Sequence, residues 1–128
     1  MLRDKLGIQE GTRVAILNAP RTYRMLLGSL PRNVERIAIV KGHADFVQFF
    51  TTSREELADC FPHLKRGLAP AGMLWICWPK AARSTGQLNE ASVRSLGLKH
   101  GLLDVKAISI DDTWCGLKFI YRPKDRKS

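Results

Sequence analysis

Three short apolar runs, each followed at once by polar or chain-breaking residues, constrain the fold of this chain most. They lie at 14–17, 46–50 and 73–78. A nearly continuous apolar run of four to eight residues is typical of a strand that is buried on both faces, as in a parallel sheet covered by helices. The runs therefore predict a single three-layer α/β domain with a mostly parallel, Rossmann-like sheet.

The segments between these runs show the apolar spacing of helices. Pro20 stands where the first turn of a helix tolerates a missing N–H, so a helix is expected to begin there. Ser53 opens a capping-box pattern and starts a long helix, in which Pro62 is expected to cause a kink or to separate two abutting helices. Asn89 is placed to cap a further helix that Gly101 ends.

Two other features complete the predicted sheet. The apolar run 37–40 is joined to the next strand by only residues 41–45, which is too short for a parallel crossover, so it is expected to be antiparallel, at an edge, or very short. Residues 105–110 and 117–121 are expected to close the sheet as an antiparallel hairpin. If 117–121 lies at an edge, it could pair across a homodimer.

Composition supports one folded domain over residues 1–122, followed by a basic, flexible tail at 123–128. Of the 128 residues, 45% are hydrophobic and 26% charged, as in ordinary globular domains. No apolar run reaches the roughly 18 residues that cross a bilayer, and residues 1–5 lack a secretory signal's apolar stretch. We therefore expect a cytoplasmic protein whose three widely spaced cysteines are reduced.

The net charge of +9 has two interpretations. It could reflect contact with an anionic partner such as nucleic acid, or only a solvated, soluble surface. The basic residues of the first third have no shared period and those of the tail form a short run, which favours the solvated surface. They are Arg13, Arg21, Arg24, Arg32, Arg36, Arg122, Lys124, Arg126 and Lys127.

From residue 44 to 121 the order of elements resembles the C-terminal half of class I S-adenosylmethionine-dependent methyltransferases. The resemblance rests on a helix that ends in the leucine, lysine, proline and glycine pattern of residues 64–72, a following strand, and a closing antiparallel hairpin. It implies a methyltransferase-like topology. The whole chain also resembles a group of short bacterial proteins of unknown function, through residues 17–20, 52–57, 78–80 and 112–118.

The cofactor-binding features of the methyltransferases are replaced in this sequence. That family follows the first strand with an acidic residue and a glycine-rich turn, whereas residues 18–22 contain neither. It places an acidic residue after the second strand, where Lys41 follows Val40. No cofactor is therefore assigned, and S-adenosylmethionine is not expected to bind in the family's manner.

The candidate site follows from the rule that ligands of open α/β sheets bind beyond the carboxyl ends of the strands. The residues that follow four predicted strands offer an amide, hydroxyls, an ammonium, carboxylates and indoles, which suit a small planar or anionic ligand. Each also has a structural interpretation as a cap, a turn or core. The candidates are Asn18, Pro20, Thr52, Ser53, Trp78, Lys80, Asp111, Asp112 and Trp114.

Three hypotheses for function remain open. The first is a methyltransferase-like domain that binds a small, anionic or nucleotide-like ligand at this edge, with residues 80–86 as a possible phosphate loop. The second is a basic module that binds nucleic acid or an acidic protein. The third is a catalyst with Asp111 or Asp112 as base and Lys80 as stabiliser. The histidines and cysteines lack metal-site spacing, so no metal is expected.

Overall fold

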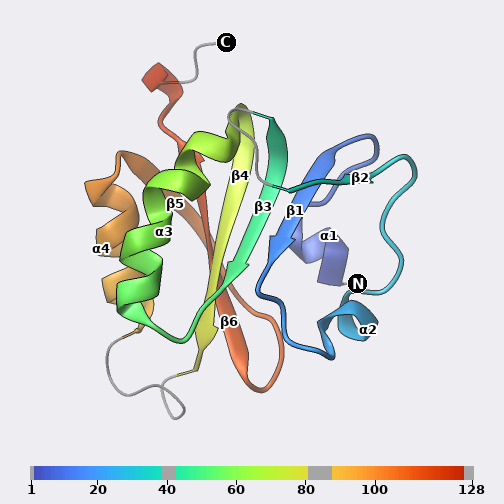
Figure 1. Cartoon of the computed structure of the whole chain (residues 1–128), viewed down its shortest axis with the longest axis horizontal. Helices are drawn as coiled ribbons and strands as arrows, with labels where there is room; N and C mark the ends of the chain where they lie inside the picture. Colours follow the sequence, from blue (N-terminus) through green and yellow to red (C-terminus); the bar gives the residue numbers. More distant parts are fainter. Residues whose placement is uncertain (1, 39–42, 81–87, 126–128) are drawn as a thin grey trace.

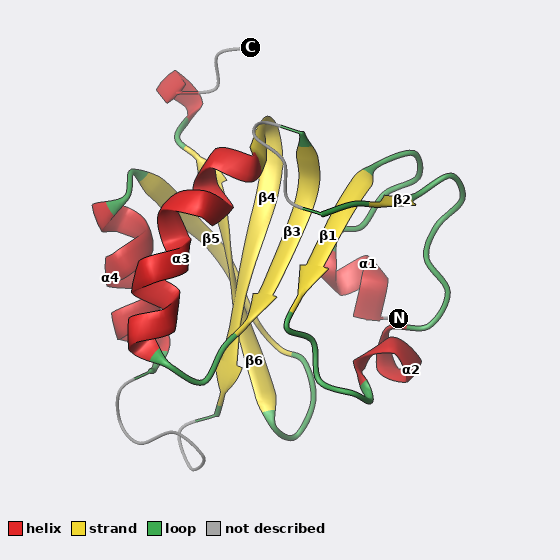
Figure 2. Ribbon diagram, in the orientation of Figure 1, coloured by secondary structure: helices red, strands yellow, loops and turns green. Residues whose placement is uncertain are grey.

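The computed structural model describes residues 2–38, 43–80 and 88–125. Among these residues, six strands form one sheet in the order β2-β1-β3-β4-β6-β5, with helices on both of its faces (Figures 1 and 2). The strands are β1 (Arg13–Leu17), β2 (Glu35–Arg36), β3 (Ala44–Phe50), β4 (Leu68–Pro79), β5 (Leu102–Ser109) and β6 (Trp114–Tyr121). The helices are α1 (Leu2–Leu6), α2 (Tyr23–Leu27), α3 (Arg54–Gly67) and α4 (Glu90–Lys99).

The sheet is mostly parallel and closes with the predicted hairpin. Strands β2, β1, β3 and β4 pair in parallel, whereas β6 is antiparallel to both β4 and β5. The chain leaves β1 to form β2 on one side and returns to form β3 on the other side. The strand order therefore changes direction at β1, which is where open α/β sheets bind ligands.

Two apolar clusters fill the spaces between the sheet and the helices. On one face, α3 contributes Leu57 and Phe61 and α4 contributes Val93, which pack against the sheet. On the other face, Leu6 of α1 and Tyr23 of α2 pack against the sheet. This confirms the three-layer α/β domain and the Rossmann-like, methyltransferase-like sheet.

Helix α3 begins and continues as its sequence predicts. The Ser53 hydroxyl accepts the backbone N–H of Glu56 at 3.1 Å, which satisfies one free donor of the first turn. Pro62 lies inside the helix, so the prediction of two separate helices was wrong. The helix axis changes direction in the half that leads into β4 (Figure 1). Strand β4 then starts at Leu68, earlier than predicted, because Leu68 pairs with Ala44 of β3.

Helix α2 differs from the prediction at its start. It begins at Tyr23, so Pro20 is not its first residue; instead the Pro20 carbonyl accepts the Tyr23 N–H at 3.0 Å. The helix ends before Gly28, whose φ of 76° is accessible to glycine at little cost. This leaves a helix of five residues on that side of β1.

The second strand is short and at the sheet edge, as predicted, but it is parallel to its neighbour and lies before the predicted run. Strand β2 covers only Glu35–Arg36, is parallel to β1 and lies at the sheet edge; residues 39–42 lie outside the described residues. Strand β6 lies inside the sheet between β4 and β5, so it offers no edge to a homodimer. In the predicted tail, Pro123–Asp125 form a 3-10 turn held by an Arg122–Asp125 ion pair at 3.1 Å.

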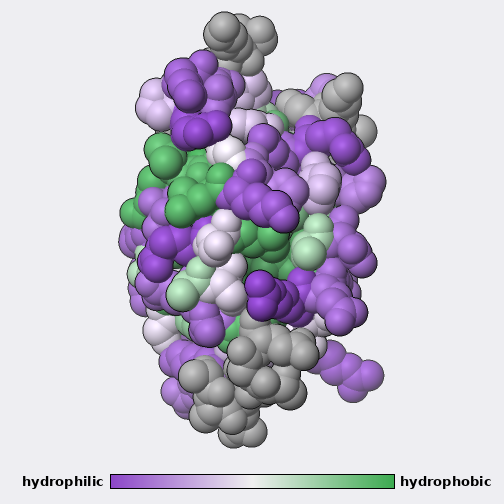
Figure 3. Space-filling model, turned by 90° about the vertical axis from the view of Figure 1, so that its left-hand side faces the viewer, coloured by the Kyte–Doolittle hydropathy of each residue, from purple (hydrophilic) through white to green (hydrophobic). Residues whose placement is uncertain are grey.

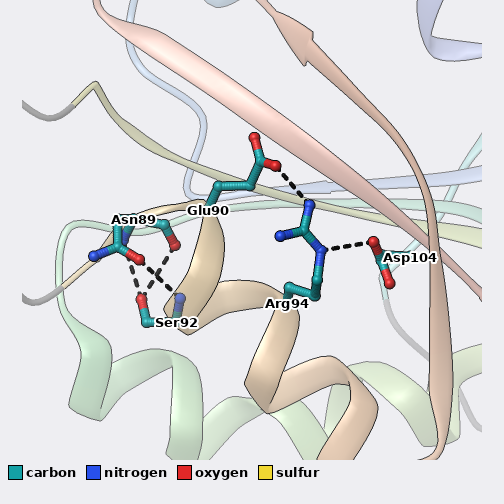
Figure 4. Close-up of polar contacts among 5 residues, drawn as sticks. All are labelled: Asn89, Glu90, Ser92, Arg94 and Asp104. Atoms are coloured by element: carbon teal, nitrogen blue, oxygen red, sulfur yellow. Dashed lines mark hydrogen bonds and ion pairs between the residues drawn. The ribbon is translucent and has the colours of Figure 1, made fainter.

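Helix α4 is tied to the hairpin by a short polar network (Figure 4). The Arg94 guanidinium binds Glu90 at 2.5 Å and Asp104 of β5 at 2.8 Å, and these two carboxylates raise its pKa. Asn89 and Ser92 form a reciprocal capping box, as the predicted cap requires.

The side of the molecule seen in Figure 3 is mostly hydrophilic with apolar patches, and the exposed apolar residues of α4 and β5 include Leu98 and Val105.

Candidate ligand site at the carboxyl-end edge of the sheet

The structure brings the ends of the predicted strands to one edge of the sheet. Strands β1, β3 and β4 end at the lower edge in Figure 1, and the turn between β5 and β6 lies there as well. The Lys80 N–H donates to the Thr113 carbonyl at 2.8 Å, and the Thr51 N–H donates to the Cys77 carbonyl at 3.0 Å. All nine predicted residues therefore lie in or beside the segments that meet at this edge.

The residues after β1 and β3 shape the start of the two following segments. Asn18 is exposed and has a φ of 58°, the left-handed conformation that turns the chain out of β1. Ser53 caps α3, and Thr52 beside it is exposed. The buried Thr51 hydroxyl donates to Glu56 at 2.6 Å, so Thr51 and Ser53 both serve the first turn of α3.

Trp78 and Lys80 are engaged within the protein. The Trp78 ring is 3% exposed and belongs to the core beneath α3 and α4. The Lys80 ammonium donates to the Ser109 hydroxyl at 2.8 Å, which links the end of β4 to the hairpin. Trp78 is therefore a core residue in this structure, as its structural interpretation predicted, and the rest of the proposed phosphate loop, residues 81–86, lies outside the described residues.

The hairpin turn uses one of its two carboxylates. Asp111 Oδ1 accepts the N–H groups of Thr113 and Trp114 at 2.8 and 2.7 Å, which is the turn-forming role of aspartate. Asp112 is exposed. The Trp114 ring packs edge-on against Phe50, with ring centroids 5.2 Å apart. Trp78 and Trp114 thus lie on opposite faces of the sheet, and the structure does not bring them together.

A pocket of about 470 Å³ lies at this edge beside α2, and most of its residues were missed by the sequence analysis. Pro20 is the one predicted site residue in its lining. Sequence spacing could have shown Arg21 and Arg24 together on the α2 segment, but only the pairing of Arg36 with Val14 reveals that β2 adds a third arginine. The lining residues are Ile16, Ala19, Pro20, Arg21, Tyr23, Arg24, Leu27, Gly28, Leu30 and Arg36.

A buried chain of polar groups begins at Tyr23, which lines this pocket. The Tyr23 hydroxyl donates to Gln48 Oε1 at 2.7 Å, and Gln48 Nε2 donates to Cys77 Sγ at 3.4 Å. Burial raises the pKa of Tyr23 well above its ordinary value, and the hydrogen bond to Gln48 offsets part of this rise. Burial also raises the pKa of the Cys77 thiol to about 12. Both groups are therefore neutral near pH 7.

The charge of the pocket comes from arginine. Arg21, Arg24 and Arg36 line it, and none of the described residues in its lining is an aspartate or glutamate. Within the described part of the chain, no three histidine, cysteine, aspartate or glutamate side chains gather in a way that could hold a metal ion. In the same residues no helix is long and apolar enough to cross a membrane. The three arginines of the lining suit the pocket to recognise anionic or polar groups on a small molecule.

Comparison with solved structures identifies the class of fold. An S-adenosylmethionine-dependent methyltransferase from Aquifex aeolicus superposes with a TM-score of 0.66 at 14% identity, covering 91% of this chain and 85% of the other. A complex of the Trm112 methyltransferase activator with a methyltransferase from Haloferax volcanii gives 0.71 at 11% identity, covering 93% and 86%. A Burkholderia thailandensis N1-methyltransferase with bound S-adenosylhomocysteine gives 0.62 at 12% identity, covering 92% and 73%.

These likenesses show a methyltransferase-like fold, as the resemblance in the sequence implied. No protein-family model and no curated protein sequence matches the chain. At identities of 11% to 14% the similarity is one of architecture.

Proposed function

We propose that this methyltransferase-like domain binds a small molecule in the pocket beside α2. The observation that carries the proposal is the position of the pocket. It opens at the carboxyl end of β1, where the strand order changes direction, and ligands of open α/β sheets bind at such a point. Its volume of about 470 Å³ lies within the range of small-molecule sites.

The ligand is not held in the manner of the methyltransferase family. The turn at 18–22 contains no glycine and turns out of β1 through Asn18. An arginine, Arg36, stands in β2, near where that family uses a carboxylate after its second strand. The fold neighbours still make S-adenosylmethionine and S-adenosylhomocysteine the compounds to test first, since one neighbour has S-adenosylhomocysteine bound.

The proposal is tested by thermal shift of the purified protein with S-adenosylmethionine, S-adenosylhomocysteine, nucleotides and short oligonucleotides. A ligand at 100 times its Kd stabilises the folded state by about 2.7 kcal/mol, which raises the Tm by several degrees in a domain of this size. We expect such a rise with at least one small molecule.

A matched pair of variants locates the binding. Ala19→Phe places a ring in the pocket lining and should abolish the shift. Ala91→Phe adds the same ring at an exposed position of α4 and should leave the shift intact. If both variants keep the shift, the ligand binds elsewhere. A shift with oligonucleotides alone, lost at moderate salt, would favour the alternative function as a basic module that binds nucleic acid.

A further inference from the structure

We infer that the ligand of this pocket carries a phosphate group, which Arg21, Arg24 and Arg36 bind together. The inference rests on the proposed function and specifies its ligand class. Its first support is the composition of the lining, which has three guanidinium groups and, among the described residues, no carboxylate. A phosphate is the small group that best matches several guanidinium forks, because each fork can donate two parallel hydrogen bonds to its oxygens.

The fold explains how three arginines reach one pocket. Arg21 lies just before α2 and Arg24 lies in its first turn. Arg36 pairs with Val14 in the parallel register of β2 and β1, so both lie on the face of the sheet that α2 covers. The side chain of Ile16, two residues further along β1, shares this face and lines the pocket.

The pocket arginines differ from three arginines of the molecule that are already paired. Arg13, Arg94 and Arg122 each form an ion pair with a carboxylate, at 3.4, 2.8 and 3.1 Å. Among the described residues, the side chains of Arg21, Arg24 and Arg36 form no ion pair, and all three residues are exposed. Three like charges around one hollow repel each other, and a bound dianion removes that repulsion.

The remaining lining describes the rest of the ligand. Ile16, Leu27 and Leu30 provide an apolar wall, and Tyr23 lies behind the arginines with its hydroxyl already bonded to Gln48. A pocket of about 470 Å³ with this wall fits an organic phosphate of about mononucleotide size. S-adenosylmethionine has a cationic sulfonium and no phosphate, so it does not match this charge.

The test compares a probe that carries a nucleoside and a phosphate with probes that carry only one of the two. The amide NMR spectrum of the protein is titrated with AMP, adenosine and inorganic pyrophosphate, and the affinities are measured by calorimetry. We expect AMP and pyrophosphate to shift the amides of residues 21–28, and adenosine to bind at least tenfold more weakly than AMP. Added salt should weaken AMP binding, because the contact is between charges.

Single variants Arg21→Gln, Arg24→Gln and Arg36→Gln should each weaken AMP and pyrophosphate binding about tenfold or more. Arg66→Gln is the matched control, because it removes the same charge from an exposed position on α3 that lies outside this pocket. Circular dichroism checks that each variant is folded. An equal loss in Arg66→Gln would mean that net charge alone attracts the anion, and would overturn the inference.

The outcomes separate the two proposals. If adenosine shifts the amides of residues 18–30 as strongly as AMP does and pyrophosphate does not shift them, the pocket binds a small molecule and the phosphate inference is wrong. If no compound, phosphate-bearing or not, shifts these amides, both proposals fail. If the phosphate probes act and only the three pocket variants lose them, both stand.

Discussion

Single side chains hold Tyr23, a residue of the pocket lining, against the sheet. Gln48 lies in the middle of β3 between β1 and β4 and is 0% exposed. A buried amide in an apolar layer is costly unless it is hydrogen-bonded. Tyr23 supplies a donor to its oxygen and Cys77 accepts from its nitrogen. This chain of hydrogen bonds therefore holds α2, and with it Arg24, at a defined place on the sheet.

We expect Tyr23→Phe to lower the free energy of unfolding by about 1 to 3 kcal/mol, because the Gln48 carbonyl oxygen is left buried without its donor. Urea denaturation of both proteins measures the difference. Replacing both partners, as Tyr23→Phe with Gln48→Leu, should recover part of the loss, since no unpaired oxygen then remains at that contact. A single variant as stable as the parent protein would show that the hydrogen bond contributes nothing.

The packing of α4 on the sheet depends on a residue without a side chain. Gly97 is buried on the face of α4 toward β6, and a Cβ at this position would lie 2.0 Å from Phe119 Cε1. Real Cβ contacts are never this short, so either the ring or the helix would have to move. The close approach explains why a helix interior keeps a residue of low helix propensity.

Gly97→Ala is therefore expected to destabilise the fold, although alanine is the better helix former by about 1 kcal/mol. The loss should be about 1 to 3 kcal/mol, as for other overpacked cores, and is measured by thermal and urea unfolding. Ser95→Ala, at an exposed position of the same helix, is the control and should be nearly neutral. A Gly97→Ala protein as stable as the parent would mean that α4 packs more loosely than described.

Elements could be predicted from sequence where local chemistry decides them. Ser53 and Asn89 begin their helices through side-chain hydrogen bonds to the backbone, and Gly101 follows α4 with a φ of 86°. The prediction failed where pairing with a distant strand decides. Leu68 joins β4 through Ala44, and β2 consists of two polar residues, Glu35 and Arg36, that pair with β1.

In the whole molecule, the sheet topology predicts the edge of the site but not the pocket. The segments that carry the nine candidate residues follow strands or turns at this edge, but their side chains do not converge on one point. The rule for strand ends could not tell that Trp78 turns into the core or that Asp111 binds its own turn. It also missed the arginines, because Arg36 joins Arg21 and Arg24 only through the register of a two-residue strand.

The change of stability with pH in the alkaline range depends on ionisable groups that are buried in the fold. An unfolded cysteine ionises near pH 8.5, whereas burial holds the pKa of Cys77 at about 12 in the folded protein. Below the pKa of Cys77 in the unfolded chain, the thiol is neutral in both states and its contribution to the free energy of unfolding is complete. Above that pKa the unfolded chain binds fewer protons than the folded one, so the free energy of unfolding falls, by up to about 1.4 kcal/mol per pH unit for one group.

The free energy of unfolding should therefore begin to fall near pH 8.5. The fall should steepen above about pH 10, because an unfolded tyrosine then also ionises while the raised pKa of Tyr23 keeps it neutral in the folded protein. Urea unfolding between pH 7 and 11 measures it. Cys77→Ala changes stability at every pH but should flatten the slope between pH 8.5 and 10. Cys60→Ala, at a half-buried position, should change the slope less. Equal slopes in the parent protein and Cys77→Ala would mean that the thiol is reached by water and ionises in the folded state.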